Sequence, residues 1–271
     1  MKSLPIYQVD VFADRPFSGN PAAVCPLREW PPDATMQAIA AENNLAETAF
    51  FARDQTRAAD YLLRWFTPTI EIELCGHATL AAGHVLLNEL AHPRDEVRFR
   101  TLHAGVLTVA RRDGALWLDL PARMPRPLSK IPAELLAGLR AAPAQVLATG
   151  NKYFAIYDDA GPIATLEPDL RELIKLSGMG VVVTAPGRDS DEDFVSRFFA
   201  PAMGVDEDPA TGSAHCLLVP YWSQRLGRTR FNATQLSPRG ARLVCELDGE
   251  RVRMSGKVQP YLKGEIVVPD N

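Results

Sequence analysis

The chain begins two apolar segments in nearly the same way, half a chain apart. One is CGHATLAAGHVLL at 75–87 and the other is TGSAHCLLVPYW at 211–222. Their glycines, Gly76 and Gly212, are 136 residues apart in a chain of 271. Four more pairs of segments repeat in the same order at offsets of 131 to 136 residues: SGNPAAV and TGNKYFAIY, PDATMQAIA and PDLRELIKL, RWFTP and RFFAP, GVLTVARRDG and GARLVCELDG. Such matches at nearly constant spacing indicate a duplicated structural unit.

Each half carries the same strand and helix signals. Alternating apolar residues, as in YQVDVF and FRTLHAGVLTVA, are typical of half-buried strands, and Asp-Gly pairs at 113–114 and 248–249 predict hairpin turns. Pro-Asp pairs at 32–33 and 168–169 suit the first turn of a helix. The segments after Gly76 and Gly212 are apolar on nearly every face, which predicts two buried central helices.

These signals predict an α+β fold of two duplicated lobes, each a curved, mostly antiparallel sheet around a central helix. The Pro-rich segment PARMPRPLSKIP at 121–132 is interpreted as the linker. We therefore expect an N-terminal lobe at 1–121 and a C-terminal lobe at 122–271. The last apolar strand, at 264–271, can pair with either lobe.

The composition of the chain indicates which kinds of molecule it can bind. The chain has 29 Lys and Arg against 33 Asp and Glu, a net charge of −4, which gives no electrostatic reason to expect nucleic acid or an anionic membrane. No run approaches the ~18–20 apolar residues of a membrane span, and the N-terminus lacks a signal-like apolar region. We expect a cytoplasmic protein that binds a small molecule.

The four cysteines, Cys25, Cys75, Cys216 and Cys245, have no CxxC spacing and lie in apolar or strand-like contexts. This pattern favours reduced thiols over a disulfide framework. His77 with Cys75 or His84 does not match the ligand spacing of structural zinc, so no metal site is predicted.

The paired helix starts have two interpretations. A helix N-terminus presents unpaired N–H groups and a partial positive charge, so two of them facing one cleft could hold a small acidic molecule. Alternatively, the glycines serve only close backbone packing.

The blocks DVFADRPFSGNPAAV, NLAETAFF, RWFTPTIEIELCGHATLA and RFFAPAMGVDEDPATGSAH resemble the PhzF-like family of phenazine-biosynthesis isomerases. That family shares its duplicated fold with diaminopimelate epimerase and proline racemase. The resemblance implies an active site between two lobes, no cofactor, and a homodimer. Family members in phenazine pathways isomerise trans-2,3-dihydro-3-hydroxyanthranilate by moving a proton.

The resemblance places the acid/base glutamate at Glu47 of LAETAFF. It places substrate-binding partners at His77, Asp208 and Ser213, beside the helix starts at Gly76 and Gly212. An enclosed carboxylate can take a proton from carbon and return it elsewhere. The residues alone favour a solvent-facing strand residue at Glu47 and a turn residue before proline at Asp208, and they leave open whether His77 and Ser213 are only first-turn residues.

Cys75 and Thr211 bear on the reaction type. Epimerases and racemases of this fold invert a stereocentre with two thiols, one from each half. Cys75 stands where one thiol belongs, but Thr211 replaces the other, and threonine is no base near neutral pH. We expect an isomerase with a single acid/base, Glu47. An amino-acid racemase or epimerase, and a non-catalytic small-acid-binding protein, are the alternatives.

Overall fold

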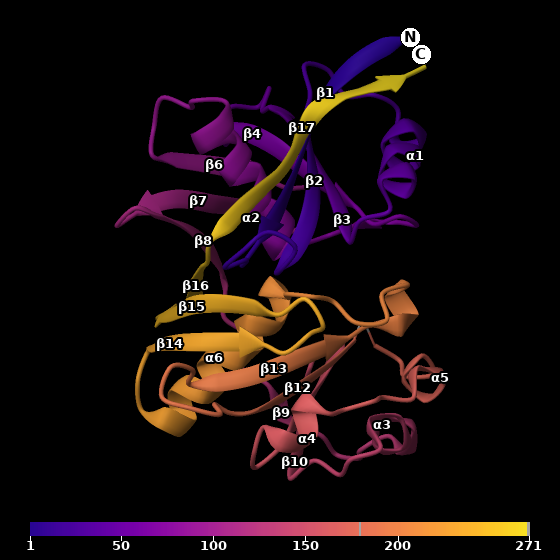
Figure 1. Cartoon of the computed structure of the whole chain (residues 1–271), viewed down its shortest axis with the longest axis vertical. Helices are drawn as coiled ribbons and strands as arrows, with labels where there is room; N and C mark the ends of the chain where they lie inside the picture. The colour runs from indigo at the N-terminus through magenta and orange to yellow at the C-terminus, as the bar shows by residue number, and fades with distance from the viewer. Residues whose placement is uncertain (179, 270–271) are drawn as a thin grey trace. The chain divides into compact units, whose positions relative to one another are not determined.

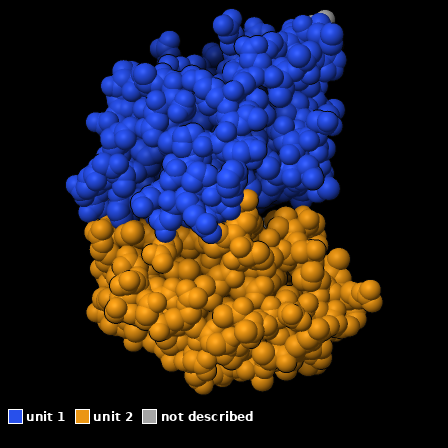
Figure 2. Space-filling model, in the orientation of Figure 1, with its two compact units in different colours: residues 1–120, 254–271 blue, residues 121–253 orange. Residues whose placement is uncertain are grey.

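The computed structural model describes residues 1–178 and 180–269 and divides them into two units (Figures 1 and 2). Unit 1 comprises 1–120 together with 254 onward, and unit 2 comprises 121–253. The boundary near residue 120 lies one residue from the predicted one. The segment from 254 belongs to the first unit, and residues 270 and 271 of the predicted last strand lie outside the described residues.

Unit 1 is a mostly antiparallel sheet whose strands follow the order β17-β1-β2-β3-β4-β6-β7-β8 (Figure 1). The pairs β2–β3 and β4–β6 are parallel and the others are antiparallel. The strands are β1 (Lys2–Val11), β2 (Asn20–Pro26), β3 (Glu47–Arg53), β4 (Tyr61–Phe66), β5 (Glu71–Ile72), β6 (Glu96–Arg100), β7 (Val106–Arg112), β8 (Ala115–Pro121) and β17 (Val258–Val268).

The central helix of unit 1 is α2 (Gly76–His84), which continues into a π-helical turn, η1 (Val85–Glu89). All nine residues of α2 are buried, and the helix contacts β1, β2, β3 and β7. Helix α1 (Asp33–Asn43) packs against a separate cluster that includes Ile6, Phe50 and Val268. The sheet of unit 1 is therefore covered by apolar side chains on both sides.

Unit 2 repeats this topology. Its order is β9-β10-β11-β12-β13-β14-β15, with β11–β12 and β13–β14 parallel and the other pairs antiparallel. The strands are β9 (Arg126–Pro127), β10 (Gln145–Thr149), β11 (Lys152–Ile156), β12 (Gly180–Pro186), β13 (Phe194–Phe199), β14 (Arg230–Gln235) and β15 (Ala241–Asp248). Strand β16 (Arg251–Ser255) spans the boundary between the units at 253–254. The series antiparallel, parallel, antiparallel, parallel, antiparallel runs through β1 to β7 and again through β10 to β15.

The central helix of unit 2 is α6 (Gly212–Leu226), inserted between β13 and β14 as α2 is inserted between β4 and β6. Ten of its residues, from Gly212 to Trp222, are buried. The other helical segments are short: α3 (Ala133–Leu139), α4 (Gly161–Ala164), α5 (Leu170–Leu173) and η2 (Pro201–Met203). The predicted α+β fold of two repeated units, each with a sheet and a central helix, is confirmed.

Several local predictions can be compared with the structure. Both central helices begin at the predicted glycines. Asp113 and Gly114 both have positive φ, the conformation that a two-residue hairpin turn requires. The helix expected after Pro168 is only four residues long, capped by Asp169. All four cysteines are free and buried.

Candidate active site

Three chain segments bring Glu47, Cys75 and His77 together inside unit 1. Glu47 is the first residue of β3 and pairs with Ala22 of β2. Cys75 immediately precedes α2, and His77 is the second residue of that helix. One potential ligand atom from each of the three lies within 4.8 Å of the others. Glu47 and His77, which the sequence placed at one site, are therefore neighbours.

The imidazole of His77 is the centre of this cluster. Its Nε2 lies 3.0 Å from Oε2 of Glu47, while its Nδ1 lies 3.1 Å from Nδ2 of Asn20 and 3.5 Å from Sγ of Cys75. The Asn20 side-chain amide contacts Nδ1, and Nε2 faces the Glu47 carboxylate as an ion-pair contact. Both ring nitrogens are thus engaged within unit 1.

Burial and neighbouring groups shift the pKa of His77 in opposite directions. Its side chain is 3% exposed, and that burial by itself lowers its pKa. Cys75 and Glu47 act the other way and outweigh the burial, so the pKa of His77 lies well above 6.5. The charge of Glu47 is the cause that operates near neutral pH, because burial and Glu47 raise the pKa of Cys75 to about 11 and keep it a neutral thiol.

The Glu47 side chain contacts His77 but is not fully buried. Its Oε2 is buried against His77, while the side chain as a whole is 13% exposed. Ala49 and Phe51, on the same side of β3, are buried. The carboxylate is therefore positioned by a charged partner in apolar surroundings and keeps some access from outside.

Asp208, Thr211 and Ser213 surround the start of α6 in unit 2. Asp208 accepts a hydrogen bond of 2.6 Å from the Thr211 hydroxyl on Oδ2, and its backbone N–H donates to the carbonyl of Phe198. Ser213, the second residue of α6, is half-buried. Of the sequence-predicted residues, Glu47, Gly76 and His77 belong to unit 1, and Asp208, Gly212 and Ser213 belong to unit 2.

Both helix starts leave backbone donors free. The N–H groups of Gly76 and His77, and those of Gly212 and Ser213, have no hydrogen-bond acceptor among residues 1–178 and 180–269. A helix of this length carries a partial positive charge at its first turn. Each start can therefore bind a carboxylate or another anion.

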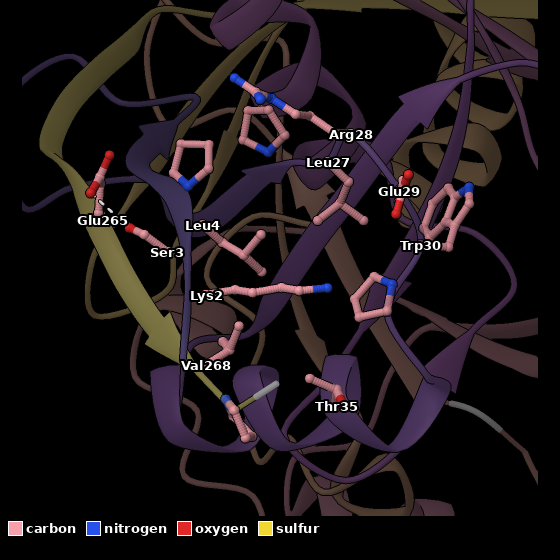
Figure 3. Close-up of a pocket in the computed structure, with 14 residues that line it drawn as sticks. Lys2, Ser3, Leu4, Leu27, Arg28, Glu29, Trp30, Thr35, Glu265 and Val268 are labelled. Atoms are coloured by element: carbon pink, nitrogen blue, oxygen red, sulfur yellow. Dashed lines mark hydrogen bonds between the residues drawn. The ribbon is translucent and has the colours of Figure 1, made fainter. Parts of the chain in front are cut away.

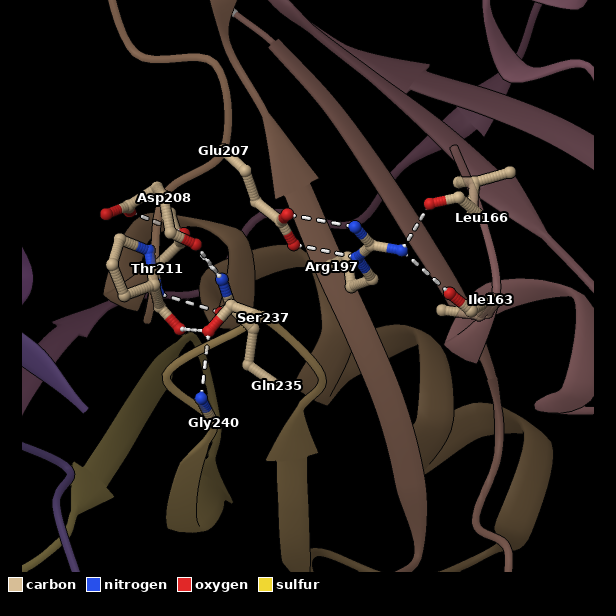
Figure 4. Close-up of polar contacts among 10 residues, drawn as sticks. Ile163, Leu166, Arg197, Glu207, Asp208, Thr211, Gln235, Ser237 and Gly240 are labelled. Carbon is tan, nitrogen blue, oxygen red and sulfur yellow. Dashed lines mark hydrogen bonds and ion pairs between the residues drawn. The ribbon is translucent and has the colours of Figure 1, made fainter. Parts of the chain in front are cut away.

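Gln235 and Arg197 clamp the loop that carries Asp208 (Figure 4). Gln235 donates to the Asp208 carbonyl at 2.7 Å and accepts from the Thr211 N–H at 2.8 Å. Arg197 forms a bidentate pair with Glu207 at 2.7 and 2.9 Å, and its Nη1 donates to the carbonyls of Ile163 and Leu166. These contacts fix the backbone on both sides of Asp208.

Asn20 and Gln235 were not predicted from the sequence. Asn20 belongs to the repeated SGN and TGN segments, so its place in the duplication was a usable signal. Gln235 lies in an alternating polar and apolar pattern that predicts only a strand, so the sequence gives no signal for its contact with the Asp208 loop. His215, which follows Ser213 by two residues, is a core side chain: it bonds to the Thr211 carbonyl through Nδ1, and burial lowers its pKa to about 4.

A cavity of about 800 Å³ lies elsewhere in unit 1 (Figure 3). Its walls come from the ends of β1 and β17 and the segment 26–31, with Lys2, Leu27, Trp30 and Val268 among the lining residues. The one hydrogen bond drawn among them joins Ser3 to Glu265 at 2.7 Å. None of the predicted site residues lines this cavity, and it gathers no comparable acid–base cluster.

Comparison with known proteins identifies the family. The family model for phenazine biosynthesis-like proteins, PhzC-PhzF, matches residues 9–265. The chain belongs to this family. A relative from Pseudomonas aeruginosa named an uncharacterised isomerase is 51% identical over 263 residues, covering 97% of this chain and 98% of the relative. Another from Halalkalibacterium halodurans, also named an uncharacterised isomerase, is 41% identical over 270 residues, covering 99% and 100%.

A solved PhzF-family structure from Enterococcus faecalis superposes with a TM-score of 0.91 at 42% identity, covering 98% of this chain and 100% of the other. The resemblance inferred from the sequence blocks is confirmed, and so is the assignment to the isomerases. The described helices include none that is long and apolar enough to cross a membrane.

The clamp on the Asp208 loop gives a stability prediction. Arg197→Leu leaves Glu207 partly buried without its cation, and we expect a loss of about 3–5 kcal/mol in the free energy of unfolding. The control is Arg253→Leu, because Arg253 and its partner Asp248 are 40% and 61% exposed, and the loss of this pair should be below about 1 kcal/mol. Urea denaturation measures both. Equal small losses would show that the Arg197–Glu207 pair does not hold this loop.

Proposed function

We propose that this isomerase moves a proton on a small cyclic or amino or hydroxy acid, using Glu47 as the single acid/base and no cofactor. The observation that carries the proposal is the contact between Glu47 and His77, 3.0 Å apart beside the free N–H groups at the start of α2. The reaction resembles that of dihydro-hydroxyanthranilate isomerases, which the family resemblance implies.

The proposed step needs no co-reactant. The Glu47 carboxylate takes a proton from one substrate carbon, the electrons of that C–H bond shift the neighbouring double bond, and protonated Glu47 returns the proton to another carbon. Reactant and product then differ only in the position of a hydrogen and a double bond. A positioned acid/base of this kind contributes about 10²–10⁴-fold to the rate.

His77 is assigned to positioning Glu47, because both of its ring nitrogens are engaged inside unit 1. Its backbone N–H, with that of Gly76, remains available to bind an acidic substrate. In unit 2, we propose that Asp208 and Ser213 are substrate-binding residues, together with the N–H groups of Gly212 and Ser213. The free donors favour a substrate with a carboxylate.

Two alternatives make different predictions. A racemase of this fold needs a second thiol, and Thr211 stands at that position. A non-catalytic binding protein would lose affinity when Glu47 is replaced but would turn over no compound. We also propose that the enzyme is a homodimer, as the family resemblance implies.

Replacing Glu47 tests the acid/base assignment. Substrates are first identified by incubating small cyclic, amino and hydroxy acids with the enzyme in deuterated water and detecting carbon-bound deuterium by mass spectrometry. We expect Glu47→Gln to lower kcat by about 10²–10⁴-fold, because the amide keeps the shape but cannot accept a proton. Glu42→Gln, an exposed change in α1, is the matched control. Glu47→Gln with wild-type kcat would refute the assignment.

Replacing Cys75 tests the racemase alternative. Cys75 is 5% exposed and its pKa is raised to about 11, so it is a poor nucleophile near neutral pH. We expect Cys75→Ser to retain activity within about threefold of wild type, and thiol alkylation to inactivate slowly. Rapid inactivation against which substrate protects would instead support thiol chemistry.

A further inference from the structure

Strand β17 forms an open edge of the sheet in unit 1 (Figure 1). It pairs antiparallel with β1 from Val11–Val258 to Lys2–Val268, with a bulge opposite Gln8 and Val9. Among the described residues, no strand other than β1 pairs with β17. All residues from 260 to 265 are exposed. The backbone groups on the outer side of β17 are therefore available to another strand.

This edge also carries large apolar side chains. Tyr261 is 54% exposed, Leu262 44% and Val267 67%. Phe17, 70% exposed, makes an edge-on ring contact with Tyr261 at 5.9 Å between centroids. A long edge strand with exposed apolar residues invites association unless something covers it.

The sequence of β17 complements itself about Gly264. In YLKGEIV, at 261–267, a lysine precedes the glycine and a glutamate follows it, and apolar residues flank both. If two copies of this segment pair antiparallel with Gly264 opposite Gly264, Lys263 faces Glu265 of the other copy. Leu262 then faces Ile266, and Tyr261 faces Val267. Each of these three cross-strand pairs is favourable and occurs twice.

Nothing within the chain itself requires a glycine at position 264. A Cβ there would meet only Cδ2 of Leu262, at 3.9 Å, and its φ is not in the left-handed region. A glycine inside a strand often marks a place where another backbone approaches closely. Pairing about a two-fold axis puts the closest approach of the two copies at this residue.

We propose that two copies of this chain associate through β17, pairing antiparallel about a two-fold axis at Gly264. The inference rests on the proposed homodimer and assigns its surface. A second copy fits better than an unrelated peptide, because the charge order Lys263, Gly264, Glu265 is complementary to itself. Lys263 contacts Glu89 at 3.3 Å and lies 5.4 Å from the Tyr7 ring centroid, yet its side chain stays 63% exposed. Glu265, also exposed, accepts a hydrogen bond of 2.7 Å from Ser3.

The test uses charge exchange and measures mass by analytical ultracentrifugation. The wild type should sediment as twice the chain mass of 29.7 kDa. Lys263→Glu places two glutamates opposite two glutamates, and Glu265→Lys places lysines opposite lysines. We expect each to raise the dimer dissociation constant by about tenfold or more. The double variant Lys263→Glu/Glu265→Lys should restore the dimer.

Mixing the two single variants tests the proposed pairing most directly. One copy then presents only glutamates and the other only lysines, so the mixture should form dimers although neither variant does alone. Lys257→Glu is the control, since Lys257 is 71% exposed and lies outside the paired segment. A monomeric wild type would overturn both the homodimer and this interface. Dimers insensitive to both single changes would overturn only the interface, and neither result bears on Glu47 as acid/base.

Discussion

The contact between Glu47 and His77 is the interaction on which the site depends. It joins the start of β3 to the start of α2, and Asn20 at the start of β2 holds the other side of the imidazole. A buried histidine beside a carboxylate is stable only if each offsets the desolvation of the other. The burial of α2 and the register of β2 with β3 bring these groups together, so the fold itself positions the proposed acid/base, Glu47.

The duplicated units differ in the side chains at the starts of their central helices, and the proposed acid/base lies in only one of them. The two central helices occupy the same place in the two topologies, and each leaves two N–H groups free at its start. The side chains at these starts have diverged: Cys75 and His77 correspond to Thr211 and Ser213. Unit 1 thereby gained a titratable cluster. Unit 2 holds hydroxyl groups and a clamped aspartate, Asp208, which suit binding more than proton transfer.

Sequence could predict the parts of the fold that local chemistry determines. Gly76 and Gly212 begin helices because apolar runs follow them, and Asp113-Gly114 forms the hairpin because both residues tolerate positive φ. The placement of β17 beside β1 could not be predicted, since it depends on a pairing between the two ends of the chain. Gln235 was missed for the same reason, since its contact with Thr211 joins residues 24 apart in sequence. Asn20 lies in a repeated segment, but its contact with His77, 57 residues away, could not be predicted from that repeat.

The most direct test of the central contact is the titration of His77 followed by NMR of its imidazole. The raised pKa implies that the charged form is favoured by folding, so this stabilisation is complete below about pH 6.5 and is lost as the pH rises through the folded-state pKa. We expect the wild-type imidazole to titrate well above 6.5, and Glu47→Gln to lower that value because the carboxylate charge is gone. A His77 that titrates at or below its ordinary value, unchanged in Glu47→Gln, would contradict the account.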